Sequence, residues 1–197
     1  MLYSIKGKLI SKKPFSCVIR VSMFQGSYMD FELTIPLSTY EQLGEEGSDE
    51  ELYVYPAFVK GELVVYGFKT QEDRMLFTRL IKLIGIGPSL AVRLLSGMNA
   101  EELLAAISNE DLKKLAGIKG VGKKRAERLI FELKGKLPEF EAERREEARN
   151  IGEQAIDALI ALGLKPKEAE TAVKKVLDSS HDLSVEDIIK LALSQMK

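Results

Sequence analysis

A twelve-residue pattern occurs twice in this chain, as IGIGPSLAVRLL at residues 84–95 and as KGVGKKRAERLI at residues 119–130. Both copies read Gly, an apolar residue, Gly, three further residues and Ala, and the offset between them is 35 residues. Glycine adopts positive φ readily and lets the backbone approach a partner closely. The repeat therefore predicts two successive units, each made of a helix, a tight Gly-x-Gly hairpin and a second helix.

The start of each second helix is a candidate phosphate site, because its first backbone N–H groups have no partner within the helix. Such contacts position a nucleic-acid backbone without reading its bases. One Gly-x-Gly before a helix is usually only a tight turn, but two copies in register favour phosphate binding. Ile86 and Val121 are expected to tuck between the helices of each pair. The candidate DNA-binding residues are Gly85, Ile86, Gly87, Pro88, Ser89 and Arg93 in the first copy, and Gly120, Val121, Gly122, Lys123, Lys124 and Arg125 in the second.

The positive charge of the chain is concentrated around this repeat. The whole chain has 29 Lys and Arg residues against 30 Asp and Glu residues, which excludes a uniformly basic surface. Residues 67–138 hold 14 basic and 8 acidic residues, a net charge of +6, whereas residues 1–66, 139–150 and 151–197 carry −3, −2 and −2. The middle third is therefore the candidate for a polyanionic partner.

Several function classes are poorly supported. Cys17 and His181 are the only cysteine and histidine, which excludes an intramolecular disulfide and a cysteine zinc site and argues against a Ser-His-Asp triad. Neither hairpin follows a strand, and no Gly-x-x-x-x-Gly-Lys-Ser/Thr motif occurs, which argues against ATP hydrolysis. We expect no cofactor and no metal. Cys17 is expected in the core of a β-barrel formed by residues 1–66, and His181 is expected in an exposed loop.

The sequence also bears on location and on alternative functions. It has no run of 18 apolar residues and no basic start followed by an apolar stretch, so we expect a cytoplasmic protein with no membrane partner. Two alternatives stay open. A nuclease or glycosylase could use the same hairpins, but would need clustered carboxylates or an activated lysine beside them. A pure protein-interaction scaffold is the other alternative, and the paired hairpins argue against it.

The regions around the repeat predict an α+β multidomain chain. Residues 1–66 contain five short runs of β-branched and aromatic residues, typical of a small closed or nearly closed barrel. Residues 67–138 show the apolar spacing of helices. Residues 139–150 are so highly charged that we interpret them as a flexible linker, with a fraying helix as the alternative. Residues 151–197 contain three amphipathic stretches, which predict a small three-helix module.

Taken together, these features resemble the RuvA family, the Holliday-junction-binding subunits of the bacterial RuvAB branch-migration complex. The resemblance covers essentially the whole chain. Its most specific stretches are YGF at 66–68, QEDRMLF at 71–77, LIK at 80–82, GIGP at 85–88, LSGM at 95–98, GVGKK at 120–124, AERL at 126–129 and ALGL at 161–164.

The resemblance implies an N-terminal OB-type β-barrel, a tandem helix-hairpin-helix domain and a mobile, UBA-like C-terminal module. It implies a non-catalytic subunit that recognises four-way DNA junctions by their structure, in recombination, DNA repair and the SOS response. The implied partners are junction DNA, the RuvB motor ATPase that docks on the last domain, the RuvC resolvase, and further copies of the chain in a homotetramer or octamer.

The resemblance also implies an acidic pin, a barrel turn whose carboxylates repel phosphates at the centre of the tetramer. The matching turn here is Lys60-Gly61-Glu62, so Glu62 is the single carboxylate where the family commonly has two. Without the resemblance, Glu62 is equally well explained as an exposed turn residue.

Two more features follow from the resemblance. The family's RuvB-docking positions match Leu159, Leu162, Leu164 and Leu193, although leucines at helical spacing more often form a core. Ser89 stands where many relatives carry Lys, so the first hairpin is expected to grip DNA less strongly unless Arg93 supplies the charge. Residues 22–28 also depart from the usual turn of the family.

Overall fold

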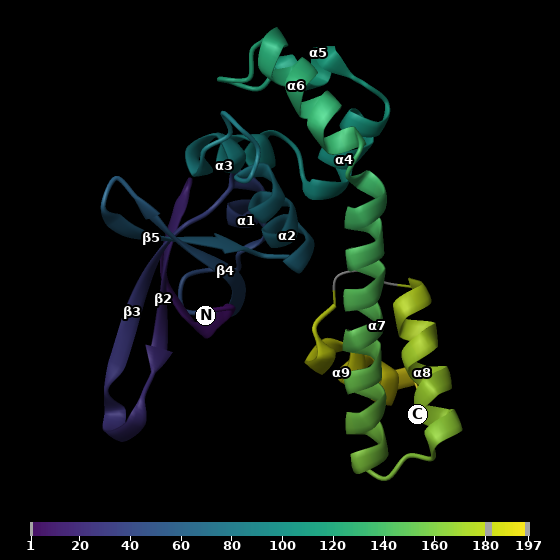
Figure 1. Cartoon of the computed structure of the whole chain (residues 1–197). Helices are drawn as coiled ribbons and strands as arrows, with labels where there is room; N and C mark the ends of the chain where they lie inside the picture. Colours follow the sequence, from purple (N-terminus) through teal and green to yellow (C-terminus); the bar gives the residue numbers. More distant parts are fainter. Residues whose placement is uncertain (1, 180–182, 196–197) are drawn as a thin grey trace. The chain divides into compact units, whose positions relative to one another are not determined.

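The computed structural model describes residues 2–179 and 183–195. Two compact units are present, Met1–Leu137 and Pro138–Lys197 (Figure 1). His181, expected in an exposed loop, lies outside the described residues.

The first unit begins with a closed barrel of five strands, as the sequence predicts. Cys17 and Ile19 on the second strand both point inward and are buried, because alternate residues of a strand share a face. The strands are β1 (Ser4–Lys13), β2 (Ser16–Ser22), β3 (Tyr28–Thr34), β4 (Asp49–Val59) and β5 (Glu62–Phe68). Their order is β1-β2-β3-β5-β4, and only the β3–β5 pair, which closes the barrel, is parallel. The barrel core consists of Ile5, Leu9, Cys17, Ile19, Leu33, Ile35, Leu43, Leu52 and Val54.

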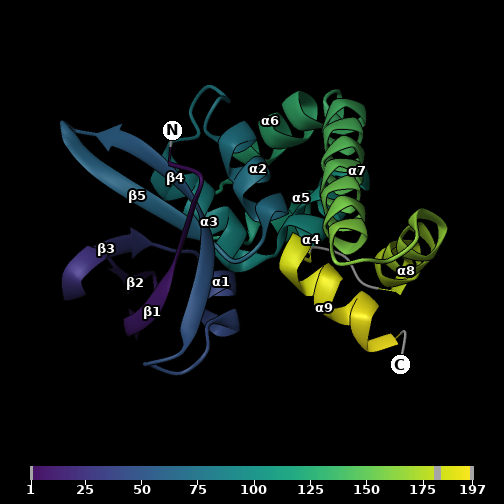
Figure 2. The ribbon, with the colours of Figure 1, turned by 90° about the horizontal axis from the view of Figure 1, so that it is seen from below.

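Two short elements of this region are not predicted by the sequence. A 3-10 turn, Phe24–Gly26, joins β2 to β3, and α1 (Leu37–Gln42) lies between β3 and β4. The Ser38 hydroxyl on α1 donates a hydrogen bond to the Leu95 carbonyl at 2.7 Å. The helix α1 thus lies beside the helix at Pro88–Gly97 (Figure 2), and this contact ties the barrel region to the helical part of the same unit.

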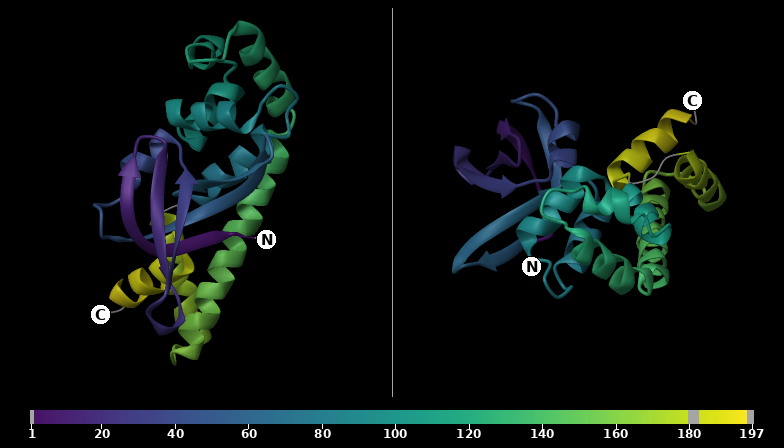
Figure 3. Two further views of the ribbon diagram at one scale, coloured as in Figure 1. Left: turned by 90° about the vertical axis from the view of Figure 1, so that its left-hand side faces the viewer. Right: turned by 90° about the horizontal axis from the view of Figure 1, so that it is seen from above.

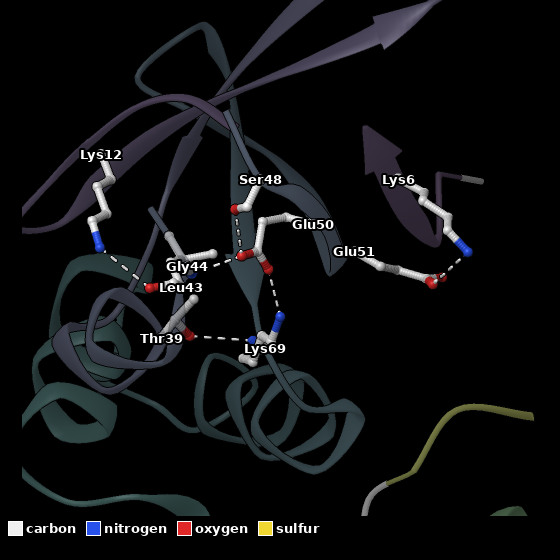
Figure 4. Close-up of polar contacts among 9 residues, drawn as sticks. All are labelled: Lys6, Lys12, Thr39, Leu43, Gly44, Ser48, Glu50, Glu51 and Lys69. Carbon is white, nitrogen blue, oxygen red and sulfur yellow. Dashed lines mark hydrogen bonds and ion pairs between the residues drawn. The ribbon is translucent and has the colours of Figure 1, made fainter. Parts of the chain in front are cut away.

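A buried carboxylate connects three parts of the barrel (Figure 4). Glu50 is 6% exposed and accepts hydrogen bonds from the Lys69 ammonium at 2.5 Å, the Gly44 N–H at 2.7 Å and the Ser48 hydroxyl at 3.1 Å. Burial by itself raises the pKa of Glu50, but these hydrogen bonds and the charge of Lys69 outweigh it, so the pKa lies below its usual value. Burial, and then the charge of Glu50, raises the pKa of Cys17 to about 12.

Helices complete the first unit, as the spacing of apolar residues predicts. They are α2 (Gln71–Leu80), α3 (Pro88–Gly97), α4 (Ala100–Ser108), α5 (Leu112–Ala116) and α6 (Lys123–Lys134). The helix α2 lies against the barrel (Figure 3). The ring centroid of Phe77 on α2 lies 4.9 Å from that of Tyr66 and 4.9 Å from that of Phe68. The Arg74 Nε atom donates to the Val54 carbonyl at 2.8 Å. The first helix of the helical domain is therefore held against the barrel by both an aromatic cluster and a hydrogen bond.

The second unit consists of three helices, α7 (Leu137–Ala161), α8 (Pro166–Ser179) and α9 (Val185–Gln195). The Ser184 hydroxyl caps α9 by accepting the Asp187 N–H at 3.1 Å. The buried core of this unit contains Ala155, Leu159, Ala169, Ala172, Val173, Val176, Ile188 and Ala192. A small three-helix module is therefore present, as predicted.

Of the two interpretations of residues 139–150, the structure favours the helix over the flexible linker, because this segment is helical and belongs to α7. Arg145 pairs with Glu141 at 3.7 Å, and Arg149 pairs with Glu146 at 3.3 Å and with Glu153 at 3.4 Å. Pairs three or four residues apart stabilise a helix by about 0.2–0.5 kcal/mol each. The charged residues that indicated a linker thus support an exposed helix.

Candidate nucleic-acid interface

The two Gly-x-Gly hairpins have the same backbone conformation. Gly85 and Gly120 have φ values of +86° and +91°, which glycine adopts without strain. The Ile86 N–H donates to the Leu83 carbonyl at 3.1 Å, and the equivalent Val121 N–H donates to the Ile118 carbonyl at 2.9 Å. The sequence repeat is therefore a structural repeat.

The apolar residue of each hairpin is buried, Ile86 to 6% exposure and Val121 to 1%. This confirms that both side chains tuck into the protein. A buried side chain cannot contact DNA directly, so Ile86 and Val121 stay among the candidate DNA-binding residues through their backbone alone. Their role is to fix the hairpins, which leaves only their backbone for contact.

Both second helices begin at a glycine that has no side-chain cap. Gly87 precedes α3 and Gly122 precedes α6, both in an extended conformation, and a Cβ atom at either glycine would meet nothing within 4 Å. Ser89 and Lys124 in the first turns are exposed. In the first copy the Ser89 N–H, and in the second copy the Lys123 and Lys124 N–H groups, lie in the first turn and have no partner within the helix, whereas Pro88 has no N–H. The partial positive charge of each helix end favours an anion there.

The side chains around the hairpins differ. In the second copy, Lys123, Lys124 and Arg125 are all exposed at the start of α6, and the Arg125 Nη1 atom donates to the Gly120 carbonyl at 2.7 Å. In the first copy, the same positions hold Pro88, Ser89 and Leu90. The second hairpin thus carries three local cations where the first has none.

A cation outside the predicted set lies at the first hairpin. A cleft beside this hairpin is lined by Ile84, Gly85 and Ile86 together with Arg125 and Arg128 of α6, among others. The Arg128 Nη1 atom lies 4.0 Å from the position that a Cβ atom on Gly85 would take. Arg128 could have been predicted from the sequence, because it occupies in the second copy of the repeat the position that Arg93 has in the first.

Two features are absent from the described part of the chain. Among residues 2–179 and 183–195, no three His, Cys, Asp or Glu side chains gather where they could hold a metal ion. In this same part of the chain, no helix combines the length and the apolar character needed to cross a membrane.

Comparison with known proteins agrees with the geometry. The family model "SAM-like Helix-hairpin-helix tandem" matches residues 77–136, which include both hairpins, and "RuvA, C-terminal domain" matches residues 150–197. A protein of Pasteurella multocida is 39% identical over 207 residues, which cover 98% of each chain. Proteins of Actinobacillus succinogenes and Solibacter usitatus are 38% identical over 207 residues, covering 98% of each chain, and 33% identical over 202 residues, covering 100% of each. The chain belongs to the RuvA family. All three relatives are named Holliday junction branch migration complex subunit RuvA, which confirms the family recognised from the motifs.

The turn that matches the acidic pin of the RuvA family is an exposed β-hairpin. Lys60 and Gly61 have φ values of 54° and 89°, and this pair of positive angles suits a two-residue turn between twisted strands. Glu62 is exposed directly after the turn, and Phe58 and Leu63 beside it are 80% and 60% exposed. The turn is therefore accessible to a partner.

The four leucines at the docking positions of the RuvA family have different environments. Leu162 and Leu193 are 63% and 38% exposed, and Leu164 is partly buried against the core of the second unit. Leu159 is completely buried in that core. This corrects the prediction for Leu159, since its side chain serves the fold and is not accessible to RuvB.

Proposed function

We propose that this chain binds four-way DNA junctions by their structure and serves as the junction-recognition subunit for RuvB-driven branch migration in recombination and repair. The observation that carries this proposal is the duplicated hairpin, with two uncapped helix starts of the same geometry inside the only basic segment. The names of the RuvA relatives support the choice of a junction over other DNA forms.

The proposed contacts explain recognition without sequence readout. Backbone N–H groups and lysines bind phosphates, which are the same in every sequence. Each phosphate contact makes binding weaker as salt rises, with a slope of about 0.9 in log units per contact. When several copies of the chain bind one junction, their weak individual affinities combine into a higher overall affinity. A homotetramer, or an octamer of two stacked rings, would therefore bind best to a DNA with the shape of the crossover.

The barrel turn has the opposite charge. In a four-fold assembly, four copies of Glu62 would meet near the crossover and repel phosphates, which would help to keep the strands apart. The single carboxylate in each subunit makes this a reduced form of the pin.

The second unit is the proposed contact with the motor. Leu162 and Leu193 are exposed apolar side chains on a small helical unit, as a docking surface requires. We assign ATP hydrolysis to RuvB and regard the chain itself as non-catalytic. RuvC is a further proposed partner, and the proposed place of action is the cytoplasm, where bacterial chromosomal DNA lies.

A gel-shift competition tests the proposal. A labelled four-way junction is challenged with unlabelled junction or with unlabelled duplex of equal length, and only the junction should compete strongly. Equal competition by duplex would contradict junction recognition. Preference for a damaged duplex would favour a glycosylase, and no binding at all would favour a protein scaffold.

A further inference from the structure

Each hairpin lies against an arginine of the other repeat. The Arg93 Nη2 atom on α3 lies 3.4 Å from the position that a Cβ atom on Gly120 would take, and Arg128 on α6 stands in the same relation to Gly85, at 4.0 Å. Arg93 and Arg128 are 35 residues apart, the offset of the repeat. The two halves of the domain therefore exchange equivalent side chains.

The first hairpin gains most from this exchange. Its helix starts with Pro88 and Ser89 at the positions of Lys123 and Lys124, so its own first turn carries no positive charge. The cleft beside it is lined by Gly85 of the hairpin and by Arg125, Arg128 and Glu132 of α6, among other residues. Both cations that line this cleft, Arg125 and Arg128, thus come from the second repeat.

Both arginines are placed to contact a ligand. Arg93 is exposed, and it has no carboxylate within ion-pairing distance among the residues that the structure describes. The Arg128 Nε atom donates to the Glu132 carboxylate at 2.6 Å, and the Arg128 side chain remains 46% exposed. Glu132 therefore acts as a positioning residue, because it holds one edge of the guanidinium and leaves Nη1 beside Gly85.

We propose that each DNA phosphate bound at a hairpin is shared between the repeats, with Arg128 contacting the phosphate at the first hairpin and Arg93 the phosphate at the second. A guanidinium presents a rigid fork of donors that fits two phosphate oxygens, which an ammonium group does not. This inference rests on the proposed DNA binding, but it adds which residue serves which site.

Double-mutant cycles on the full-length chain test the exchange. Ser89→Glu and Lys124→Glu each place a carboxylate at equivalent exposed positions and so disable one hairpin. Arg93→Gln and Arg128→Gln each remove one guanidinium and should weaken junction binding by roughly tenfold or more. Arg145→Gln on α7 is the matched control for loss of one exposed arginine, and thermal unfolding verifies that every variant is folded.

The pattern of coupling decides the matter. Arg128→Gln should add little once Ser89→Glu has disabled the first hairpin, and should be additive with Lys124→Glu. Arg93→Gln should show the reverse pattern. Coupling within the same repeat, equal coupling to both hairpins, or arginine variants that bind like the control would overturn the exchange. A wild-type chain that fails to prefer the junction would instead refute the proposed function.

Discussion

The two hairpins share one backbone and differ in charge. Their glycine angles and internal hydrogen bonds agree closely, yet Lys123 and Lys124 begin the second helix where Pro88 and Ser89 begin the first. The comparison shows that glycines and buried apolar residues set the backbone geometry of both hairpins, whereas the neighbouring side chains set the charge beside each proposed phosphate site. The same backbone can thus form one hairpin with a strong and one with a weak proposed affinity for DNA.

The largest effect is expected from reversing the charge of the strong hairpin. Lys123→Glu with Lys124→Glu should lower junction affinity by on the order of a hundredfold or more, since it replaces two cations with two anions in every subunit. A gel shift at moderate salt measures the affinity, and thermal unfolding should be nearly unchanged because both residues are exposed. An unaltered binding curve would refute the hairpin assignment.

A smaller effect at both hairpins is expected from a charge at the helix starts. Gly87→Asp and Gly122→Asp meet no neighbour and give each helix a favoured N-cap residue, so stability should hold or rise slightly. The carboxylate nevertheless occupies the proposed phosphate site, and junction affinity should fall by roughly tenfold in each variant. Fluorescence anisotropy with the corresponding Ala variants as controls measures this. Asp variants that bind the junction as tightly as the Ala variants would show that the helix starts do not contact phosphate.

Charge reversal at the barrel turn should affect junction affinity less than the substitutions at either hairpin. Glu62→Lys removes a repulsion instead of an attraction, so junction affinity should change by no more than about threefold. Branch migration driven by RuvB should slow, because the strands are no longer held apart. Glu32→Lys, at another exposed position of the barrel, is the control. A change confined to affinity would argue against the pin.

Substitution of the exposed Leu162 in the second unit should leave junction affinity unchanged. Leu162→Asp alters a side chain that is 63% exposed, so the fold should persist while stimulation of RuvB falls. ATP hydrolysis by RuvB on junction DNA measures the stimulation. Leu159→Asp, at the buried position, should instead unfold this unit. Full stimulation by Leu162→Asp would remove Leu162 from the docking surface.

We expect Glu50 in the barrel to make the folding stability of the protein sensitive to acid. This effect does not involve either hairpin. The pKa of Glu50 is lowered in the folded state, so its contribution to stability is present at neutral pH and is lost as the pH falls below the unfolded value toward the folded one. Glu50→Gln should therefore be less stable at pH 7, by roughly 1–3 kcal/mol, and should lose less stability between pH 5 and pH 3. Chemical unfolding at a series of pH values measures both. A variant that is as acid-sensitive as the wild type would exclude Glu50 as the cause.

Much of the fold and of the interface was predictable because its signals are local. The Gly-x-Gly repeat specified both hairpins, alternation specified the barrel strands, and a single basic segment indicated the DNA-binding part. Local charge was misleading at residues 139–150, which are helical and carry i,i+4 ion pairs on the exposed surface of the helix. Burial was also beyond local pattern, since Leu159 and Leu162 look alike in sequence but only one of them is in the core.

The sequence by itself determined where the two hairpins, the barrel strands and most of the helices are, and which segment carries the positive charge, because backbone preferences and periodicity act over a few neighbouring residues. Only the tertiary structure decided which residues from distant segments meet. Glu50 finds Lys69, Ile86 and Val121 become buried, and Arg93 and Arg128 each lie beside the other repeat's glycine. These contacts depend on how helices and strands pack, and packing is a property of the whole unit and not of any short stretch of sequence.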